Sequence, residues 1–275
     1  MAAKPIRLAV SRLSHPHAIS TTRSNLTKTD RSRDMMVKDR LKSFVRAAGY
    51  EIRRHHPNLT EFLQSRSVNL VLDVGANEGQ FGQDLRSQGY SGKIVSFEPV
   101  VDVFKSLEKR CAADQKWECR NTALGDANGI IQINVSKNTA MSSIVSQTEI
   151  GRASIYESQV VRVDQVPIAT LDSMFAEFAG ERVFLKVDTQ GFEQSVLRGG
   201  ANSLHNLLGV QLELPLIHLY EDTWKFDEAL SFMREAGFTL SQLRPVTYYS
   251  RDPASLLEVD CVFRRTKYAG GVSRP

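Results

Sequence analysis

The stretch Val71-Leu72-Asp73-Val74-Gly75-Ala76-Asn77-Glu78-Gly79-Gln80 joins an apolar run to a glycine turn, and it decides the fold class. The run from residue 68 to 74 lacks polar alternation, which is typical of a strand buried on both faces of a parallel sheet. Glycines let the turn approach a ligand closely, and the helix that follows offers it free N–H groups. The stretch therefore predicts a nucleotide-type ligand at the carboxyl end of a first strand.

Strand and helix patterns alternate from this stretch onward. Alternation of units of this length predicts an α/β fold with a doubly wound, mostly parallel sheet and helices on both faces. Strands are expected over residues 68–74, 93–97, 117–124, 183–187, 209–214, 238–243 and 259–263, with short β segments over 130–135 and 160–169. Helices are expected over residues 78–88, 100–111 and 228–236.

The charge divides the chain of 275 residues into a basic front end and an acidic body. Residues 1–56 hold thirteen Lys and Arg against four Asp and Glu, a balance of +9, so the rest carries −5 of the net +4. Residues 1–34 are rich in Ser, Thr, Arg and His and predict a disordered basic tail; a transit-type peptide is the alternative. We place the main domain at residues 68–267 and a C-terminal tail at 268–275.

Residues 35–67 predict a helical extension in front of the main domain. Over residues 35–54, apolar side chains recur at three- and four-residue spacing among Lys and Arg. Such a basic amphipathic helix either packs on the domain behind it or lies on an anionic membrane surface. A peripheral membrane contact is thus one of two expectations for this segment.

The bulk composition is that of an ordinary globular protein, with 41% hydrophobic and 24% charged residues and no long apolar run. Cys111, Cys119 and Cys261 show no metal spacing and predict free thiols in a reducing compartment. We therefore expect a cytoplasmic protein, at the inner membrane face if the basic helix binds lipid. The acidic body lacks a basic cluster, so no nucleic-acid partner is expected. The oligomeric state is left open.

The glycine turn fits neither of two common nucleotide-binding patterns. Starting from Gly75, a dinucleotide fingerprint requires glycines at positions 77 and 80, where Asn77 and Gln80 stand. A phosphate-binding loop requires Lys and then Ser or Thr directly after Gly79, and neither is present. A dinucleotide and a nucleoside triphosphate are therefore disfavoured.

A second acid follows at the end of the next strand. Glu98 lies nineteen residues after Gly79, at the position from which a carboxylate reaches a ribose diol. Together with Asp73 it would repel a pyrophosphate, but it suits a ligand with a ribose and a positive charge. S-adenosylmethionine, with its amino-acid end, sulfonium and ribose, meets that description.

The chain carries five sequence blocks in this order: DVGANEG (73–79), FEP (97–99), KVDTQGFE (186–193), LRGG (197–200) and QLEL (211–214). The blocks resemble those of the FkbM-type methyltransferases, a family of class I S-adenosylmethionine-dependent enzymes, and the likeness covers about residues 68–265. The resemblance implies a Rossmann-like, seven-stranded sheet with the last strand antiparallel. It also implies O-methylation, often of a sugar hydroxyl in a glycolipid, a polysaccharide or a related glycosylated metabolite.

The resemblance also implies a set of cofactor-binding residues. The turn would hold the methionine end, the acid of FEP the ribose, and the end of the third strand the adenine. These residues are Asp73, Gly75, Ala76, Asn77, Gly79, Glu98, Asn121 and Ala123.

Two acids at the ends of neighbouring strands are the main catalytic candidates. Asp188 directly follows the apolar run VFLKV, and Glu213 lies near the end of GVQLEL. Methyl transfer needs alignment, and an alcohol must also lose a proton to a base. The two acids could act as base, as substrate hydrogen-bond acceptors or as oxygen ligands of Mg²⁺. His218, five residues after Glu213, is a third candidate base.

The acceptor pocket is expected to involve the polar loop over residues 136–150. This hydroxyl-rich segment interrupts the α/β rhythm, and insertions of this kind usually carry function. Ser142 and Ser143 are candidate substrate contacts, as is Gln190 in the DTQGFE block. Glu193 of the same block either faces the site or caps the helix that begins there.

The sequence thus predicts an O-methyltransferase that uses S-adenosylmethionine to modify a small-molecule or glycan hydroxyl. A nicotinamide-dependent oxidoreductase or epimerase is the first alternative. It is disfavoured by the missing glycines and by the absence of a Lys four residues after any Tyr. A protein that binds the cofactor without turnover is the second alternative.

Overall fold

The computed structural model describes Arg40, Ser43 and residues 57–266. The predicted basic tail, the C-terminal tail and nearly all of the predicted amphipathic helix over 35–54 lie outside these residues. Within the predicted extension, α2 (Leu59–Ser65) begins with a capping box. Asn58 accepts a hydrogen bond from the Glu61 N–H, and the Glu61 carboxylate accepts one from the Asn58 N–H.

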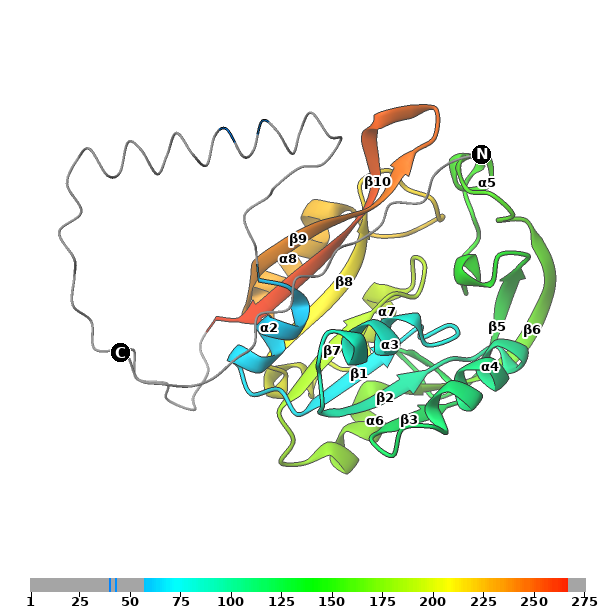
Figure 1. The fold of residues 1–275 in the computed structure, drawn as a ribbon. Helices are drawn as coiled ribbons and strands as arrows, with labels where there is room; N and C mark the ends of the chain where they lie inside the picture. Colours follow the sequence, from blue (N-terminus) through cyan, green and yellow to red (C-terminus); the bar gives the residue numbers. More distant parts are fainter. Residues whose placement is uncertain (1–39, 41–42, 44–56, 267–275) are drawn as a thin grey trace. The chain divides into compact units, whose positions relative to one another are not determined.

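The core of the fold is a seven-stranded sheet in the order β3-β2-β1-β7-β8-β10-β9 (Figure 1). Its strands are β1 (Leu70–Val74), β2 (Lys93–Phe97), β3 (Trp117–Arg120), β7 (Val183–Val187), β8 (Gly209–Pro215), β9 (Phe238–Tyr249) and β10 (Asp252–Arg265). The first five strands in this order pair in parallel, and β10 pairs antiparallel with both β8 and β9. The predicted mostly parallel sheet with an antiparallel last strand is confirmed.

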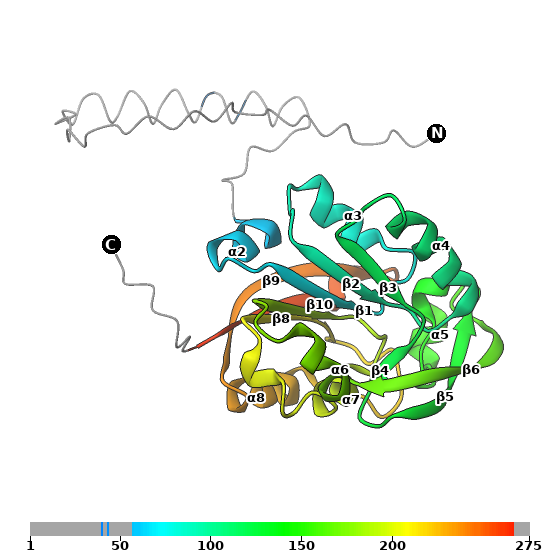
Figure 2. The ribbon, with the colours of Figure 1, turned by 90° about the horizontal axis from the view of Figure 1, so that it is seen from below.

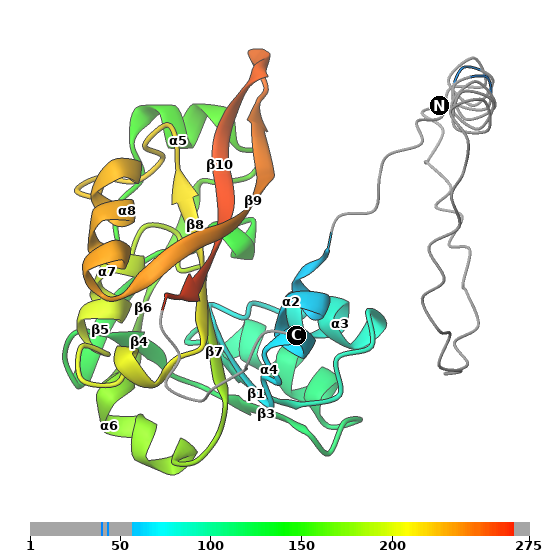
Figure 3. The ribbon, with the colours of Figure 1, turned by 90° about the vertical axis from the view of Figure 1, so that its left-hand side faces the viewer.

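Helices cover both faces of this sheet, as Figure 3 shows edge-on. Side chains of β1 alternate between two apolar clusters: Leu70, Leu72 and Val74 join one, and Val71 joins the other. This alternation explains why Leu70, Val71, Leu72 and Val74 are all apolar; the one exception in the strand is the buried acid Asp73. The helices are α3 (Gln80–Ser87) and α4 (Val101–Cys111) on the side of α2, and α6 (Leu171–Phe175), α7 (Glu193–Arg198) and α8 (Phe226–Glu235) on the other.

A smaller sheet, in the order β4-β6-β5, lies beside the main one (Figure 2). It comprises β4 (Ala123–Gly125), β5 (Gly129–Ser136) and β6 (Val160–Thr170). The single strand expected over residues 117–124 is therefore wrong, because β3 and β4 belong to different sheets. The chain turns at Asn121, whose amide donates to the carbonyls of Glu98 and Pro99, both at 2.9 Å.

The last two strands extend well beyond the segments predicted for them. β9 spans 12 residues and β10 spans 14, and their far ends form a hairpin that projects from the sheet (Figure 1). β9 is exposed or half-buried at every position after Phe238, so no apolar run marks it, and Pro245 interrupts the strand pattern of the projecting half. The remaining elements are short: η1 (Thr139–Met141), α5 (Glu149–Ser154), η2 (Ala176–Phe178) and η3 (Leu204–Asn206).

Candidate functional site

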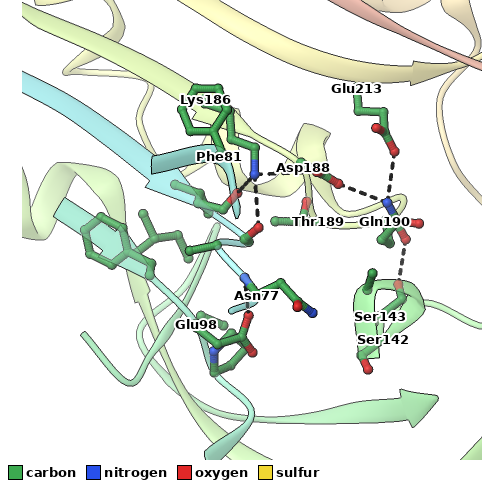
Figure 4. A pocket seen from close by; sticks show the side chains of 18 of the residues that line it. Asn77, Phe81, Glu98, Ser142, Ser143, Lys186, Asp188, Thr189, Gln190 and Glu213 are labelled. Atoms are coloured by element: carbon green, nitrogen blue, oxygen red, sulfur yellow. Dashed lines mark hydrogen bonds and ion pairs between the residues drawn. The ribbon is translucent and has the colours of Figure 1, made fainter. Parts of the chain in front are cut away.

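A cavity of about 330 Å³ lies where the strand order reverses, between β1 and β7 (Figure 4). This is the place where open α/β sheets bind ligands. Ten of the residues predicted for the site border it: Gly75, Ala76, Asn77, Glu98, Ala123, Ser142, Ser143, Asp188, Gln190 and Glu213. Four others do not: Asp73, Gly79, Asn121 and His218.

The glycine turn brings β1 against the end of β7. Gly75 has φ +73°, and a Cβ at this position would lie 1.8 Å from the carbonyl oxygen of Asp188. Asn77 is also left-handed, with φ +47°. Its N–H donates to Glu98 at 2.9 Å and its amide to Thr139 Oγ1 at 3.2 Å. The turn therefore links the end of β2, the end of β7 and the η1 loop around the cavity.

Asp73 lies behind the turn rather than in the cavity. Its buried carboxylate is 3.1 Å from Lys186 Nζ, and it accepts a hydrogen bond from Ser96 Oγ at 3.0 Å. These three residues occupy opposite positions on β2, β1 and β7, so their side chains form one polar row across the sheet. Lys186 also donates to the Gly75 carbonyl at 3.0 Å. Asp73 thus holds the turn through Lys186.

Lys186 itself was not singled out as a site residue. It borders the cavity, with Nζ 3.5 Å from the Asp188 carboxylate and 5.4 Å from the centre of the Phe81 ring. Burial opposes its charge, but the carboxylates of Asp73 and Asp188 outweigh this and raise the pKa of Lys186. The sequence did carry a signal for Lys186: it is the one charged residue in the apolar run VFLKV, and lysine is almost never buried unless it is paired.

Glu98 presents a buried carboxylate at the other end of the cavity. One oxygen accepts the Asn77 N–H at 2.9 Å and the other the Val100 N–H at 2.8 Å. Burial nevertheless raises the pKa of Glu98 to about 7. The Asn121 side-chain amide donates a hydrogen bond to the Glu98 backbone carbonyl and so fixes the position of this residue. The Glu98 carboxylate can therefore accept hydrogen bonds from a diol. Asn121 does not border the cavity and contributes by fixing the loop that carries Glu98.

Asp188 and Glu213 share one hydrogen-bond donor, the side chain of Gln190. The Gln190 side-chain N–H groups donate to both carboxylates at 2.9 Å (Figure 4). The Gln190 side-chain oxygen accepts the Tyr220 hydroxyl at 2.8 Å. Burial and the neighbouring Asp188 raise the pKa of Glu213 well above its usual range. Asp260 lies opposite Glu213 on β10, and burial raises the pKa of Asp260 as well. This side of the cavity is rich in hydrogen-bond acceptors.

The polar loop meets Gln190 from the opposite side. Ser143 Oγ donates to the Gln190 carbonyl at 2.6 Å, while Ser142 Oγ accepts the Ser136 N–H at 3.2 Å. Gln190 has φ +56°, and the buried Glu193 carboxylate fixes the turn by accepting the Gly191 N–H at 3.1 Å. Both serines border the cavity, and their hydroxyls also satisfy the backbone of the loop and turn.

His218 is not brought to the cavity. Its Nδ1 lies 2.8 Å from Thr223 Oγ1, and its carbonyl accepts the Thr148 hydroxyl at 3.0 Å. A base role would require this side chain to move from its bond to Thr223.

The part of the chain that the structure describes contains no group of three His, Cys, Asp or Glu side chains placed to hold a metal ion. Between Asp188 and Glu213, the Gln190 amide stands where a bridging cation would bind. The magnesium role of this pair therefore stays a prediction without structural support.

The free energy of unfolding is expected to depend on pH through Glu258 of β10. Burial, with the Asp188 carboxylate nearby, raises the pKa of Glu258 from 4.5 to about 7. The unfolded chain therefore loses this proton before the folded one, so wild-type stability falls as pH rises from about 4.5 to 7. We expect Glu258→Gln to gain roughly 1–3 kcal/mol of unfolding free energy over wild type at pH 8 and little at pH 4.5. Urea unfolding at both pH values measures this, and an equal difference at both would contradict it.

The sheet order, the glycine turn and the carboxylate at the end of β2 define a class I, S-adenosylmethionine-dependent methyltransferase. Residues 73–240 match the model of the methyltransferase FkbM domain. The chain belongs to the FkbM methyltransferase family.

No curated protein sequence matches the chain significantly. Among solved structures, Streptococcus pneumoniae Sp1610 in complex with S-adenosyl-L-methionine is 13% identical with a TM-score of 0.44, over 77% of this chain and 74% of that one. An rRNA methylase from Streptococcus thermophilus is 10% identical with a TM-score of 0.40, over 76% and 94%. A TehB-like methyltransferase from Corynebacterium glutamicum is 12% identical with a TM-score of 0.35, over 86% and 99%. Similarity at this level carries no information on the acceptor.

Proposed function

We propose that the protein transfers the methyl group of S-adenosylmethionine to a carbohydrate hydroxyl, in a glycolipid, a polysaccharide or a related glycosylated metabolite. The observation that carries this proposal is the carboxylate pair Asp188 and Glu213, both bonded to Gln190 at 2.9 Å and both facing the cavity. A sugar offers several hydroxyl donors, and these acceptors match them. Nearby phosphate groups would be repelled by the same carboxylates.

The proposal assigns each part of S-adenosylmethionine to residues that border the cavity. The turn over Gly75 and Asn77 would bind the amino-acid end, Glu98 the ribose diol, and Ala123 the adenine. The sulfonium supplies the methyl group when the cofactor is bound. The acceptor oxygen would then lie near Asp188 and Glu213, which orient the hydroxyl and take its proton. Ser142 and Ser143 would close the acceptor side.

The ribose role predicts pH-dependent cofactor binding. Two hydroxyl donors favour the ionised form of Glu98, whose pKa in the free protein is about 7. Only the ionised fraction binds well, so S-adenosylhomocysteine should bind about tenfold more tightly at pH 8 than at pH 6. Calorimetric titration measures the dissociation constant at both values. Glu98→Gln should bind more weakly at pH 8 and lose the pH dependence; a variant that retained it would assign the dependence to another group.

The first test of the activity uses labelled S-adenosylmethionine with a panel of glycolipids, polysaccharide fragments and RNA. We expect label in a carbohydrate fraction, with the added methyl on oxygen, and far less label with Glu213→Gln. Label in RNA would overturn the carbohydrate acceptor, and with it the expectation of no nucleic-acid partner. Binding of NAD⁺ instead of S-adenosylhomocysteine in calorimetry would favour the nicotinamide alternative. Binding of S-adenosylhomocysteine without transfer to any acceptor would favour a non-catalytic protein.

A glycolipid acceptor agrees with the predicted basic helix over residues 35–54, of which Arg40 and Ser43 are described and both are exposed. The residues that the structure describes contain no helix that could span a bilayer. The proposed place of action is the cytoplasm, with peripheral contact at the inner membrane face. Co-sedimentation with anionic vesicles should be lost when residues 1–56 are removed. Unchanged co-sedimentation would remove the membrane contact from the proposal.

A further inference from the structure

Within residues 57–266, one side of β6 has no neighbouring strand over most of its length. β6 pairs with β5 from Val160 to Ile168, but on its other side β4 pairs only with Ile168, Ala169 and Thr170. Among residues 57–266, no strand pairs with residues 160–167 on that side. Figures 1 and 2 show this length of β6 at the rim of the small sheet. An open edge of this kind can accept another strand.

The other sheet edges in the described chain are short or interrupted. β3 has only four residues, and β9 contains Pro245, which lacks an N–H group. The outer side of β5 is bridged by the polar loop, with hydrogen bonds in both directions between Asn134 and Ser143 at 2.8 and 3.0 Å. Among the described residues, the stretch 160–166 of β6 is thus a long edge without a proline or a bridging segment; Pro167, whose carbonyl accepts the Thr122 hydroxyl at 3.2 Å, ends it.

The residues along this edge favour strand pairing. The segment over 160–166 reads VVRVDQV, and valine fits a pleated sheet well. Val161 and Val163 are 56% and 54% exposed on the same face of the strand. Exposed apolar side chains on an open edge are what natural proteins usually avoid unless a partner covers them.

The charged residues of the segment over 160–166 indicate which partner strand would fit this edge. Arg162 and Asp164 flank Val163 and point to the other face, where Arg162 lies 3.0 Å from both Asp164 and Asp102. If a second copy pairs antiparallel about a two-fold axis at Val163, Arg162 of each copy lies opposite Asp164 of the other. The two valines at the axis face each other, and an isologous contact of this kind closes as a dimer.

We propose that two copies of this chain associate through β6, antiparallel and centred on Val163, so that their small sheets join into one. The contact leaves the charge pairs within each copy in place and adds two between the copies. The segment is self-complementary in charge, and this is the reason for choosing a second copy over a different protein.

Charge reversal tests the register. Arg162→Asp places two acids opposite each other, and Asp164→Arg places two bases opposite each other. We expect each variant to raise the dimer dissociation constant at least roughly tenfold in sedimentation equilibrium of the full chain. In an equimolar mixture of the two variants, every charge again faces its opposite, so dimers should return.

The mixture separates pairing from misfolding, because a variant that fails to fold cannot be rescued by the other. Lys93→Glu is the matched control: it makes the same change in charge in an exposed pair with Glu118, away from β6, and should leave the dimer intact. A wild-type protein that stays monomeric up to about 100 µM would overturn the proposal. So would single variants that dimerise like wild type, or a mixture that does not.

Discussion

Glu213→Gln is expected to lower kcat by roughly 10²–10⁴-fold, the usual contribution of a positioned general base. Glutamine keeps the size of the side chain and an oxygen that can accept the Gln190 amide, at 2.9 Å in the wild type. It cannot take the acceptor proton. Burial raises the pKa of the Glu213 carboxyl, and a more basic carboxylate takes up the proton of a hydroxyl more readily.

Asp188→Asn is the companion variant, since its carboxylate lies on the other side of the same Gln190 amide. If Asp188 only orients the hydroxyl, its variant should raise the KM of the acceptor more than it lowers kcat. Initial rates with labelled cofactor over pH 5–9 measure both constants. Near-normal kcat in Glu213→Gln, with kcat lost in Asp188→Asn, would transfer the base role to Asp188. Affinity for S-adenosylhomocysteine should stay near wild type in both variants, which separates catalysis from cofactor binding.

Gly75→Ala is expected to give the largest loss of stability among single changes in the turn. The added Cβ would lie 1.8 Å from the Asp188 carbonyl oxygen, and the residue would also keep φ at +73°. Since backbone rather than a flexible side chain is in the way, β1 and β7 must separate at the cavity. We expect a loss of about 3–5 kcal/mol, together with weaker binding of S-adenosylhomocysteine.

Gly180→Ala provides the matched control for that variant. Gly180 has φ +85°, but no atom of the described residues lies within 4 Å of an added Cβ. It should cost only the strain of the left-handed backbone, about 1–2 kcal/mol, and leave cofactor binding unchanged. Urea unfolding and calorimetry compare the two. Equal losses in both variants would show that the close approach of Gly75 to Asp188 contributes nothing.

The structure confirms the elements whose signals are local. The mainly apolar runs over 70–74, 93–97, 183–187 and 209–214 are strands, because a strand buried on both faces is apolar except where a buried polar group is paired, as Asp73 is with Lys186. The projecting half of β9 was missed because no residue there is buried and Pro245 interrupts the strand pattern. The break between β3 and β4 was missed because it depends on Asn121 bonding to a loop more than twenty residues away.

For the site, the sequence indicated which strand ends meet but not which side chains face the cavity. It grouped Asp73 with Glu98, yet Asp73 is paired with Lys186 on another strand, 113 positions away, and only Glu98 borders the cavity. It placed His218 beside the acids, whereas the fold holds that ring on Thr223. These outcomes depend on strand register and on single side-chain contacts, neither of which leaves a trace in local spacing.

By itself, then, the sequence determined the fold class, the family and the kind of cofactor, because glycine turns and buried strands impose local requirements on residue type. The tertiary structure alone decided that Lys186 binds the glycine turn and that Gln190 joins the two acids. It also decided that β6 has an open edge within the described part of the chain. Each of these arises from segments that come together only when the sheets assemble. Their energies depend on distances of about 3 Å between groups far apart in the chain.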